Sequence, residues 1–196
     1  MGRGEVGARR AAGFTLVEVM VAIAVVAVAT AVALPDFDQW VTNSHIRSAA
    51  AYCQESLQWA RGYALKTDEA VAVSVTSAGG ECGWTMDFYN PQTQATTPIQ
   101  GAPLMTTYEF RKRFAGIACA IGPNSLMPII MMPNGMVMTS SGAGSTATLT
   151  PADNLLVFTA KSDPQGFSTW LVRYYGAGEL RSCASASPGN LSCAGP

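Results

Sequence analysis

The pattern of apolar and polar positions divides the chain into three parts. Phe14–Leu34 is an apolar run of 21 residues, interrupted only by Glu18 and two threonines. As a helix it would be about 31 Å long, which matches the hydrocarbon core of a bilayer. We therefore expect a transmembrane or filament-core helix over residues 14–35, an amphipathic continuation over 36–67, and a globular head over 68–196.

The amphipathic part shows apolar residues at alternating intervals of four and three, the spacing of one helix face. These residues are Ile46, Ala50, Cys53, Leu57, Ala60 and Ala64. Pro35 removes a backbone donor, so it predicts a kink or a short break before the helix resumes. Within the apolar face, Cys53 is expected to be a buried small hydrophobe rather than a reactive thiol. The single histidine, His45, is expected to be solvated or packed.

After Lys66 the chain alternates short β-branched or apolar runs with clusters of Gly, Pro, Asn and Ser, which is typical of antiparallel strands. We expect strands at Val71–Val75, Trp84–Tyr89, Leu104–Phe110, Gly135–Met138, Thr146–Thr150, Leu155–Thr159, Thr169–Tyr175 and Glu179–Ser182. Asn90–Pro103 and Ala160–Gly166 are expected to be loops. One long helix followed only by strands predicts an α+β fold, in which the helix packs on an antiparallel β-sheet head.

Charge orients the N-terminal segment. Residues 1–13 hold Arg3, Arg9 and Arg10 against Glu5, so the positive-inside rule places them in the cytoplasm and the head across the membrane. A cleavable secretory signal is one alternative, with a weak site in Ala29–Ala33, but the apolar run is too long for it. A plain single-span anchor is another, and it leaves Glu18 without a reason, because a charge in a membrane span is costly.

The segment Gly13-Phe14-Thr15-Leu16-Val17-Glu18, preceded by a basic leader and followed by an apolar helix with Pro35, resembles the type III signal of type IV pilins and type II secretion pseudopilins. The resemblance implies that prepilin peptidase cuts between Gly13 and Phe14 and N-methylates Phe14. It also implies a subunit that leaves the inner membrane to join other pilins in a filament. Glu18 would then pair with the terminal amine of Phe14 on an adjacent subunit; a carboxylate that snorkels to the membrane surface is the alternative.

The order of elements, with "MMPNGMVM" and "WLVRYYGAGELR" as late Gly-centred hairpins, resembles the GspH/FimT/FimU type of pilin. This resemblance implies a minor pilin of a type IV pilus, or else a GspH-like pseudopilin of a type II secretion system. Some FimT-like pilins that capture DNA share a C-terminal Gly-Arg-x-Arg motif. Here the sequence is Gly178-Glu179-Leu180-Arg181, so an acid replaces the first arginine and a DNA-binding role is not expected.

The basic run Arg111-Lys112-Arg113 adjoins Tyr108, Phe110 and Phe114. Phosphate pairing with base stacking would suit a nucleic acid. A strand edge protected by charge against aggregation is the favoured interpretation. The mildly acidic remainder of the chain also argues against a general nucleic-acid binder.

Five cysteines are present without any CxxC pair, and one histidine cannot complete a His-rich zinc site. We expect disulfides formed outside the cytoplasm. Cys183 and Cys193 would close the C-terminal tail, and Cys82 with Cys119 would form a second pair, although four cysteines permit three connectivities.

No catalytic motif is present. The sequence has no G-x-S-x-G, P-loop or HExxH pattern. Asp36 and Asp38 follow the apolar run, where two acids are usually a solvated helix segment. We therefore expect neither an enzyme nor a cofactor, and no metal site.

Overall fold

The computed structural model describes residues 14–123, 125–141, 148–151, 153–162 and 167–185. The chain divides into two compact units, residues 1–40 and 41–196. The long helix α1 (Leu16–Thr67) begins in the first unit and ends in the second. Helical backbone continues without interruption through Pro35, so the short break does not occur there, and the kink stays a prediction.

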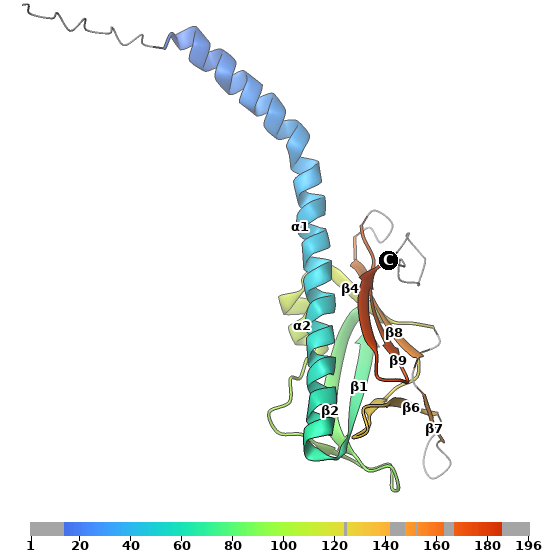
Figure 1. Ribbon diagram of the computed structural model, residues 1–196. Helices are drawn as coiled ribbons and strands as arrows, with labels where there is room; N and C mark the ends of the chain where they lie inside the picture. Colours follow the sequence, from blue (N-terminus) through green and yellow to red (C-terminus); the bar gives the residue numbers. More distant parts are fainter. Residues whose placement is uncertain (1–13, 124, 142–147, 152, 163–166, 186–196) are drawn as a thin grey trace, which may run out of the picture. The chain divides into compact units, whose positions relative to one another are not determined.

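The second unit contains two antiparallel sheets (Figure 1). The larger sheet has the order β3-β2-β1-β5-β6-β7, formed by Thr96–Pro98, Glu81–Tyr89, Ala70–Ala78, Ile129–Met131, Val137–Ser141 and Thr148–Pro151. The smaller sheet has the order β10-β9-β8-β4, formed by Leu180–Ala184, Trp170–Tyr175, Asp153–Ala160 and Ile117–Ile121. A helix on antiparallel sheets confirms the predicted α+β fold.

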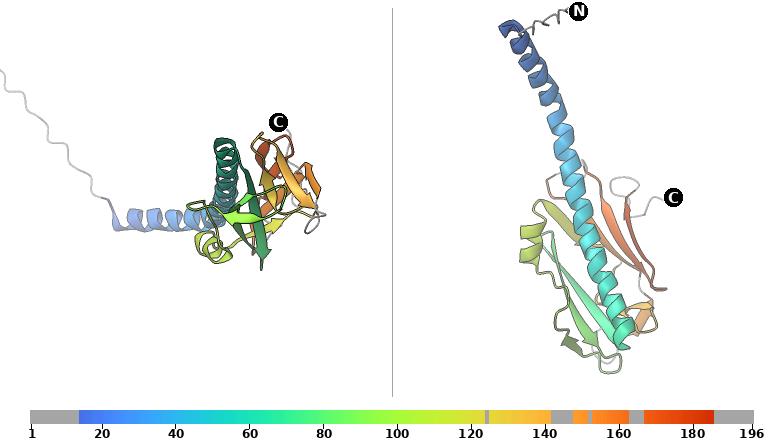
Figure 2. Two further views of the ribbon diagram at one scale, coloured as in Figure 1. Left: turned by 90° about the horizontal axis from the view of Figure 1, so that it is seen from below. Right: turned by 60° about the vertical axis from the view of Figure 1, so that its left-hand side comes forward.

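The part of α1 in the second unit lies across the strands, as the right-hand view of Figure 2 shows. Its predicted apolar face is buried at every position: Ile46, Ala50, Cys53, Leu57, Ala60 and Ala64. These side chains share one core with residues of both sheets, among them Val71, Val73 and Phe158. Successive side chains of β1 point to opposite faces of the sheet. Val71 and Val73 therefore pack in the main core, whereas Ala70 and Ala72 pack in a second, smaller cluster.

One predicted strand is wrong. Leu104–Phe110 does not form a strand, because helix α2 (Thr107–Arg113) occupies most of it. Thr106 and Glu109 form a capping box, in which Thr106 Oγ1 accepts from the Glu109 N–H at 3.1 Å and Glu109 Oε2 accepts from the Thr106 N–H at 2.9 Å. The signal T-x-x-E was present in the sequence and outweighs the β-propensity of the aromatic residues beside it.

Three short strands were missed. β4 alternates large and small apolar residues, and β5 has only three residues, too few for a periodic pattern. β3 lies within the expected loop Asn90–Pro103 and pairs only with β2, so Pro98 is tolerated at the sheet edge. The other predicted strands match observed strands with shifted ends, and residues 146–147 and 163–166 lie outside the described residues.

Candidate functional site

The N-terminal segment of α1 exposes its apolar side chains. Phe14 is 80% exposed, and the large apolar residues from Leu16 to Val28 are exposed as well. Among the residues that the structure describes, no helix is both long and apolar enough to cross a membrane. The segment therefore has a large apolar surface that the other described residues leave exposed.

Glu18 lies in the first turn of this helix. Its N–H donates to the Thr15 side-chain oxygen at 3.3 Å and to the Thr15 carbonyl at 3.1 Å. Thr15 thus caps the helix, and a carboxylate in the first turn interacts favourably with the positive end of the helix dipole. This local role was missed from the sequence, although T-x-x-E is visible there.

Phe14 and Glu18 line the same shallow hollow of about 410 Å³ on the helix surface, together with Val19, Ala22, Ile23 and Val26. The polar group therefore lies on an otherwise apolar face. Gly13, the other residue of the predicted cleavage site, lies outside the described residues.

Cys82 and Cys119 form a disulfide, the pair suggested from the sequence. The bond joins β2 of the larger sheet to β4 of the smaller one. Cys183 is disulfide-bonded, and its expected partner Cys193 lies outside the described residues. Cys53 is a free, buried thiol, and burial raises its pKa to about 12.

The first residue of β2, Glu81, is a buried acid at the junction of the sheets. Glu81 has a side chain only 6% exposed, and it accepts hydrogen bonds from Arg111 of α2 and Lys161 beyond β8. The Arg111 hydrogen bonds, followed by that of Lys161, lower the pKa of Glu81 to about 2. The charge cluster links three elements and explains how an acid is tolerated there.

The run Arg111-Lys112-Arg113 forms the last turn of α2 and not a strand edge, so the favoured interpretation is corrected. Basic residues suit the negative end of a helix dipole. Arg111 pairs with Glu81, and the Arg113 guanidinium lies 4.1 Å from the ring centroid of Tyr52. Phe110 is buried, so it is not available to stack on a base.

The C-terminal hairpin holds an ion pair in the position of the Gly-Arg-x-Arg motif. Arg181 Nε lies 2.6 Å from Glu179 Oε1, and both side chains are exposed. The acid that replaces the motif's first arginine thus pairs with the second.

Comparisons with known proteins agree with this geometry. Residues 8–34 match the family described as prokaryotic N-terminal methylation motif. No curated protein matches the chain. Among solved structures, the minor pseudopilin EpsH from the type 2 secretion system of Vibrio cholerae is similar, with a TM-score of 0.50 and 17% sequence identity over 74% of this chain and 99% of that chain.

Residues 8–34 thus carry the N-terminal methylation motif. The fold is similar to that of the minor pseudopilin EpsH. The solution structure of Escherichia coli GspH gives a TM-score of 0.48, with 14% identity over 72% of this chain and 89% of that chain.

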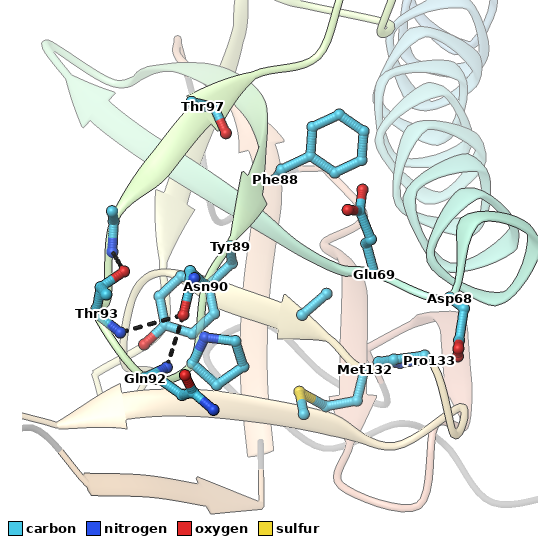
Figure 3. A pocket seen from close by; sticks show the side chains of 13 residues that line it. Asp68, Glu69, Phe88, Tyr89, Asn90, Gln92, Thr93, Thr97, Met132 and Pro133 are labelled. Carbon is cyan, nitrogen blue, oxygen red and sulfur yellow. Dashed lines mark hydrogen bonds between the residues drawn. The ribbon is translucent and has the colours of Figure 1, made fainter.

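A hollow of about 700 Å³ lies in the second unit where α1 ends (Figure 3). Asp68 and Glu69 contribute carboxylates, and Phe88 and Tyr89 contribute aromatic rings. Asn90 Oδ1 accepts from the N–H groups of Gln92 and Thr93, as the dashed lines in Figure 3 show, and so shapes the loop.

Other candidate chemistry is dispersed over the second unit. His45 is exposed beside Tyr52, Glu55 and Arg113, in a groove of about 530 Å³. Within the described part of the chain, no group of three or more His, Cys, Asp or Glu residues is placed to hold a metal ion.

Proposed function

We propose that this chain is a minor pilin of a type IV pilus, a non-enzymatic subunit that joins or primes the filament after prepilin peptidase has removed residues 1–13. Before assembly its apolar N-terminal segment would hold it in the inner membrane, with the head in the periplasm. In the filament the same segment would pack among the segments of neighbouring subunits.

The observation that supports this role best is Glu18 on an exposed apolar helix face within the methylation motif. A carboxylate in an apolar surrounding is costly unless it is paired. The methylated amine of Phe14 on an adjacent subunit would supply that partner. The pairing would fix the register of the incoming subunit, because a subunit out of register would leave a charge unpaired.

Processing is tested by mass spectrometry of the purified native protein. The proposal expects an N-terminal methylated Phe14. An intact Met1, or a terminus at any other residue, would contradict it.

Assembly is tested with Glu18→Ala. We expect normal membrane insertion and normal processing but poor recovery of the variant in sheared filaments. Glu55→Ala is the matched control, because Glu55 is an exposed glutamate of the same helix and belongs to the head. Equal incorporation of the two variants would rule out the pairing role.

A second candidate function is a pseudopilin of a type II secretion system. The fold it shares with EpsH, a minor pseudopilin of such a system, supports this candidate. Deletion of the gene separates the two: loss of surface pili supports the pilus, and loss of enzyme secretion with intact pili supports the secretion system. Nucleic-acid capture has weaker support, because the Glu179–Arg181 pair neutralises the expected cationic motif.

A further inference from the structure

A groove of about 570 Å³ lies between the second half of α1 and the β9–β10 hairpin, within the second unit. Leucines line much of it, and its polar groups come mainly from Gln58 and Arg61 of α1 and from Tyr174 and Glu179 of the hairpin. Neither the filament contact predicted for Glu18 nor a disulfide involves the residues that line this groove. Its chemistry depends on two donors that have no acceptor among the described residues.

The first donor is Arg61. Its Nε is buried and has no hydrogen-bond partner, and no carboxylate of the described residues pairs with its guanidinium. An arginine offers five N–H donors and is always charged, so an unpaired and partly buried one is unusual.

The guanidinium is held in place by two glycine turns. Gly135 and Gly178 both have positive φ, and a Cβ added at Gly178 would lie 2.8 Å from Arg61 Nη2 and 2.2 Å from the Gly135 carbonyl oxygen. The Val137 N–H donates to the Gly176 carbonyl at 3.0 Å, so the two turns are joined directly. Arg61 is thus packed against fixed backbone, and its free donors are preorganised.

The second donor is Tyr174. The residue is 1% exposed, its hydroxyl has no hydrogen-bond partner in the described residues, and it lines the same groove. Burial raises the pKa of Tyr174 well above its ordinary value, and the nearby Cys53 adds to this, whereas Arg61 lowers it. The hydroxyl therefore stays protonated at physiological pH and remains a donor.

A fixed guanidinium beside a neutral hydroxyl fits a single carboxylate, which can accept from both. The apolar walls suit a peptide segment better than a polyphosphate. Among the described residues that line the groove, Arg61 is the one cation, and Arg181 of the same hairpin is already paired with Glu179 at 2.6 Å. The groove therefore offers no row of positive charges for a nucleic acid.

We propose that this groove binds an acidic peptide segment of a neighbouring filament subunit, whose carboxylate pairs with Arg61 and accepts a hydrogen bond from the Tyr174 hydroxyl. The identity of the neighbour rests on the proposed function, but the peptide site itself does not.

The test uses the full chain in detergent, with 15N label to follow the arginine Nε–H signals. The probes are two blocked tripeptides, one with a central glutamate and one with a central glutamine. We expect the Arg61 signal to shift saturably with the glutamate peptide, at millimolar affinity, and about tenfold more weakly with the glutamine peptide. No saturable shift, or equal shifts with both peptides, would overturn the site.

Variants locate the binding. Arg61→Gln should weaken binding of the glutamate peptide about tenfold, and Tyr174→Phe should weaken it a few-fold. Arg47→Gln is the matched control, since Arg47 is an arginine of the same helix that lies over Trp170, and it should bind like the wild type. Arg61→Lys, which keeps the positive charge but not the parallel N–H donors of the guanidinium, should bind with intermediate affinity. Near-ultraviolet circular dichroism identifies any variant that fails to fold, and equal losses in Arg61→Gln and Arg47→Gln would contradict the assignment.

Two outcomes separate this proposal from the filament role. If the peptide binds as expected but the protein is never recovered in filaments, the peptide site stands and the neighbour is wrong. If a single-stranded oligonucleotide binds through Arg61 more tightly than the glutamate peptide, the site belongs to a nucleic acid and the proposal fails.

Discussion

The carboxylate of Glu81 receives two parallel hydrogen bonds from Arg111, from Nε at 3.1 Å and from Nη2 at 2.9 Å. Because Lys161 also donates to Glu81, one acid joins the start of β2 to α2 and to the end of β8. Through Lys161, which follows β8, the cluster connects the larger sheet with the smaller one near the Cys82–Cys119 disulfide.

This cluster should make stability depend on pH in the acidic range. The folded protein holds the pKa of Glu81 at about 2, below the ordinary 4.5. The stabilisation is therefore complete above about pH 4.5 and is lost as the pH falls through about 2. Thermal unfolding at intervals from pH 7 to pH 2 measures this.

Glu81→Gln is the control, because it keeps the shape but cannot ionise. We expect it to melt below the wild type at pH 7 and the difference to shrink toward pH 2. A difference that is constant over the whole range would show that Glu81 contributes nothing through its charge.

The capping box should account for the stability of α2. Thr106→Ala removes the hydroxyl that accepts from the Glu109 N–H, so we expect a loss of about 1 kcal/mol in the free energy of unfolding. Thr106→Ser keeps the hydroxyl and should be close to the wild type. Urea denaturation measures both, and equal losses in the two variants would mean that the methyl group, not the cap, matters.

Replacing Gly178 by alanine should destabilise the fold more than the same replacement at Gly116, whose backbone conformation is similar. Both Gly178 and Gly116 have positive φ, but a Cβ at Gly116 meets no atom within 4 Å, whereas at Gly178 it would lie 2.2 Å from the Gly135 carbonyl oxygen. We expect Gly116→Ala to cost about 1–2 kcal/mol from its backbone alone. Gly178→Ala should cost about 3 kcal/mol or more, because the clash is with backbone and is added to the strain. Denaturant unfolding of the two variants gives the comparison, and similar costs would refute it.

The thiol of Cys53 should be inert in the folded protein. A rise of its pKa from 9.0 to about 12 lowers the thiolate fraction at pH 8 by about a thousandfold, and the side chain is also inaccessible. Iodoacetamide without reductant should not label the native chain, and it should label one thiol in urea. Ser48→Cys, at an exposed position of the same helix, should add a thiol that reacts in the native state. Rapid native labelling of Cys53 would disprove its burial.

The long helix and the α+β class could be predicted because their signals are repetitive. The face from Ile46 to Ala64 repeats over five turns, and each of its predicted residues is buried. The segment at Leu104–Phe110 was predicted wrongly because a capping interaction between Thr106 and Glu109 outweighs the strand propensity of the aromatic residues. Propensity is a weak signal over so few residues.

The polar interactions of the head could not be predicted from sequence. Glu81 and Arg111 are 30 residues apart. Arg61 of α1 and Tyr174 of β9 line the same groove, although eight strands and helix α2 separate them along the chain. Such pairs depend on which elements the sheets bring together, and no local pattern records that. The capping of the helix by Thr15 could have been predicted, because the pattern T-x-x-E lies within the four residues from Thr15 to Glu18.

The disulfide between Cys82 and Cys119 closes a loop of 37 residues across the two sheets. A crosslink of that span typically adds about 2–4 kcal/mol, and it forms only where the surroundings are oxidising. A newly made copy, still facing the reducing interior of the cell, would lack this brace and be easier to degrade. With the periplasmic head proposed above, a copy would gain this stabilisation only once its head has crossed the membrane.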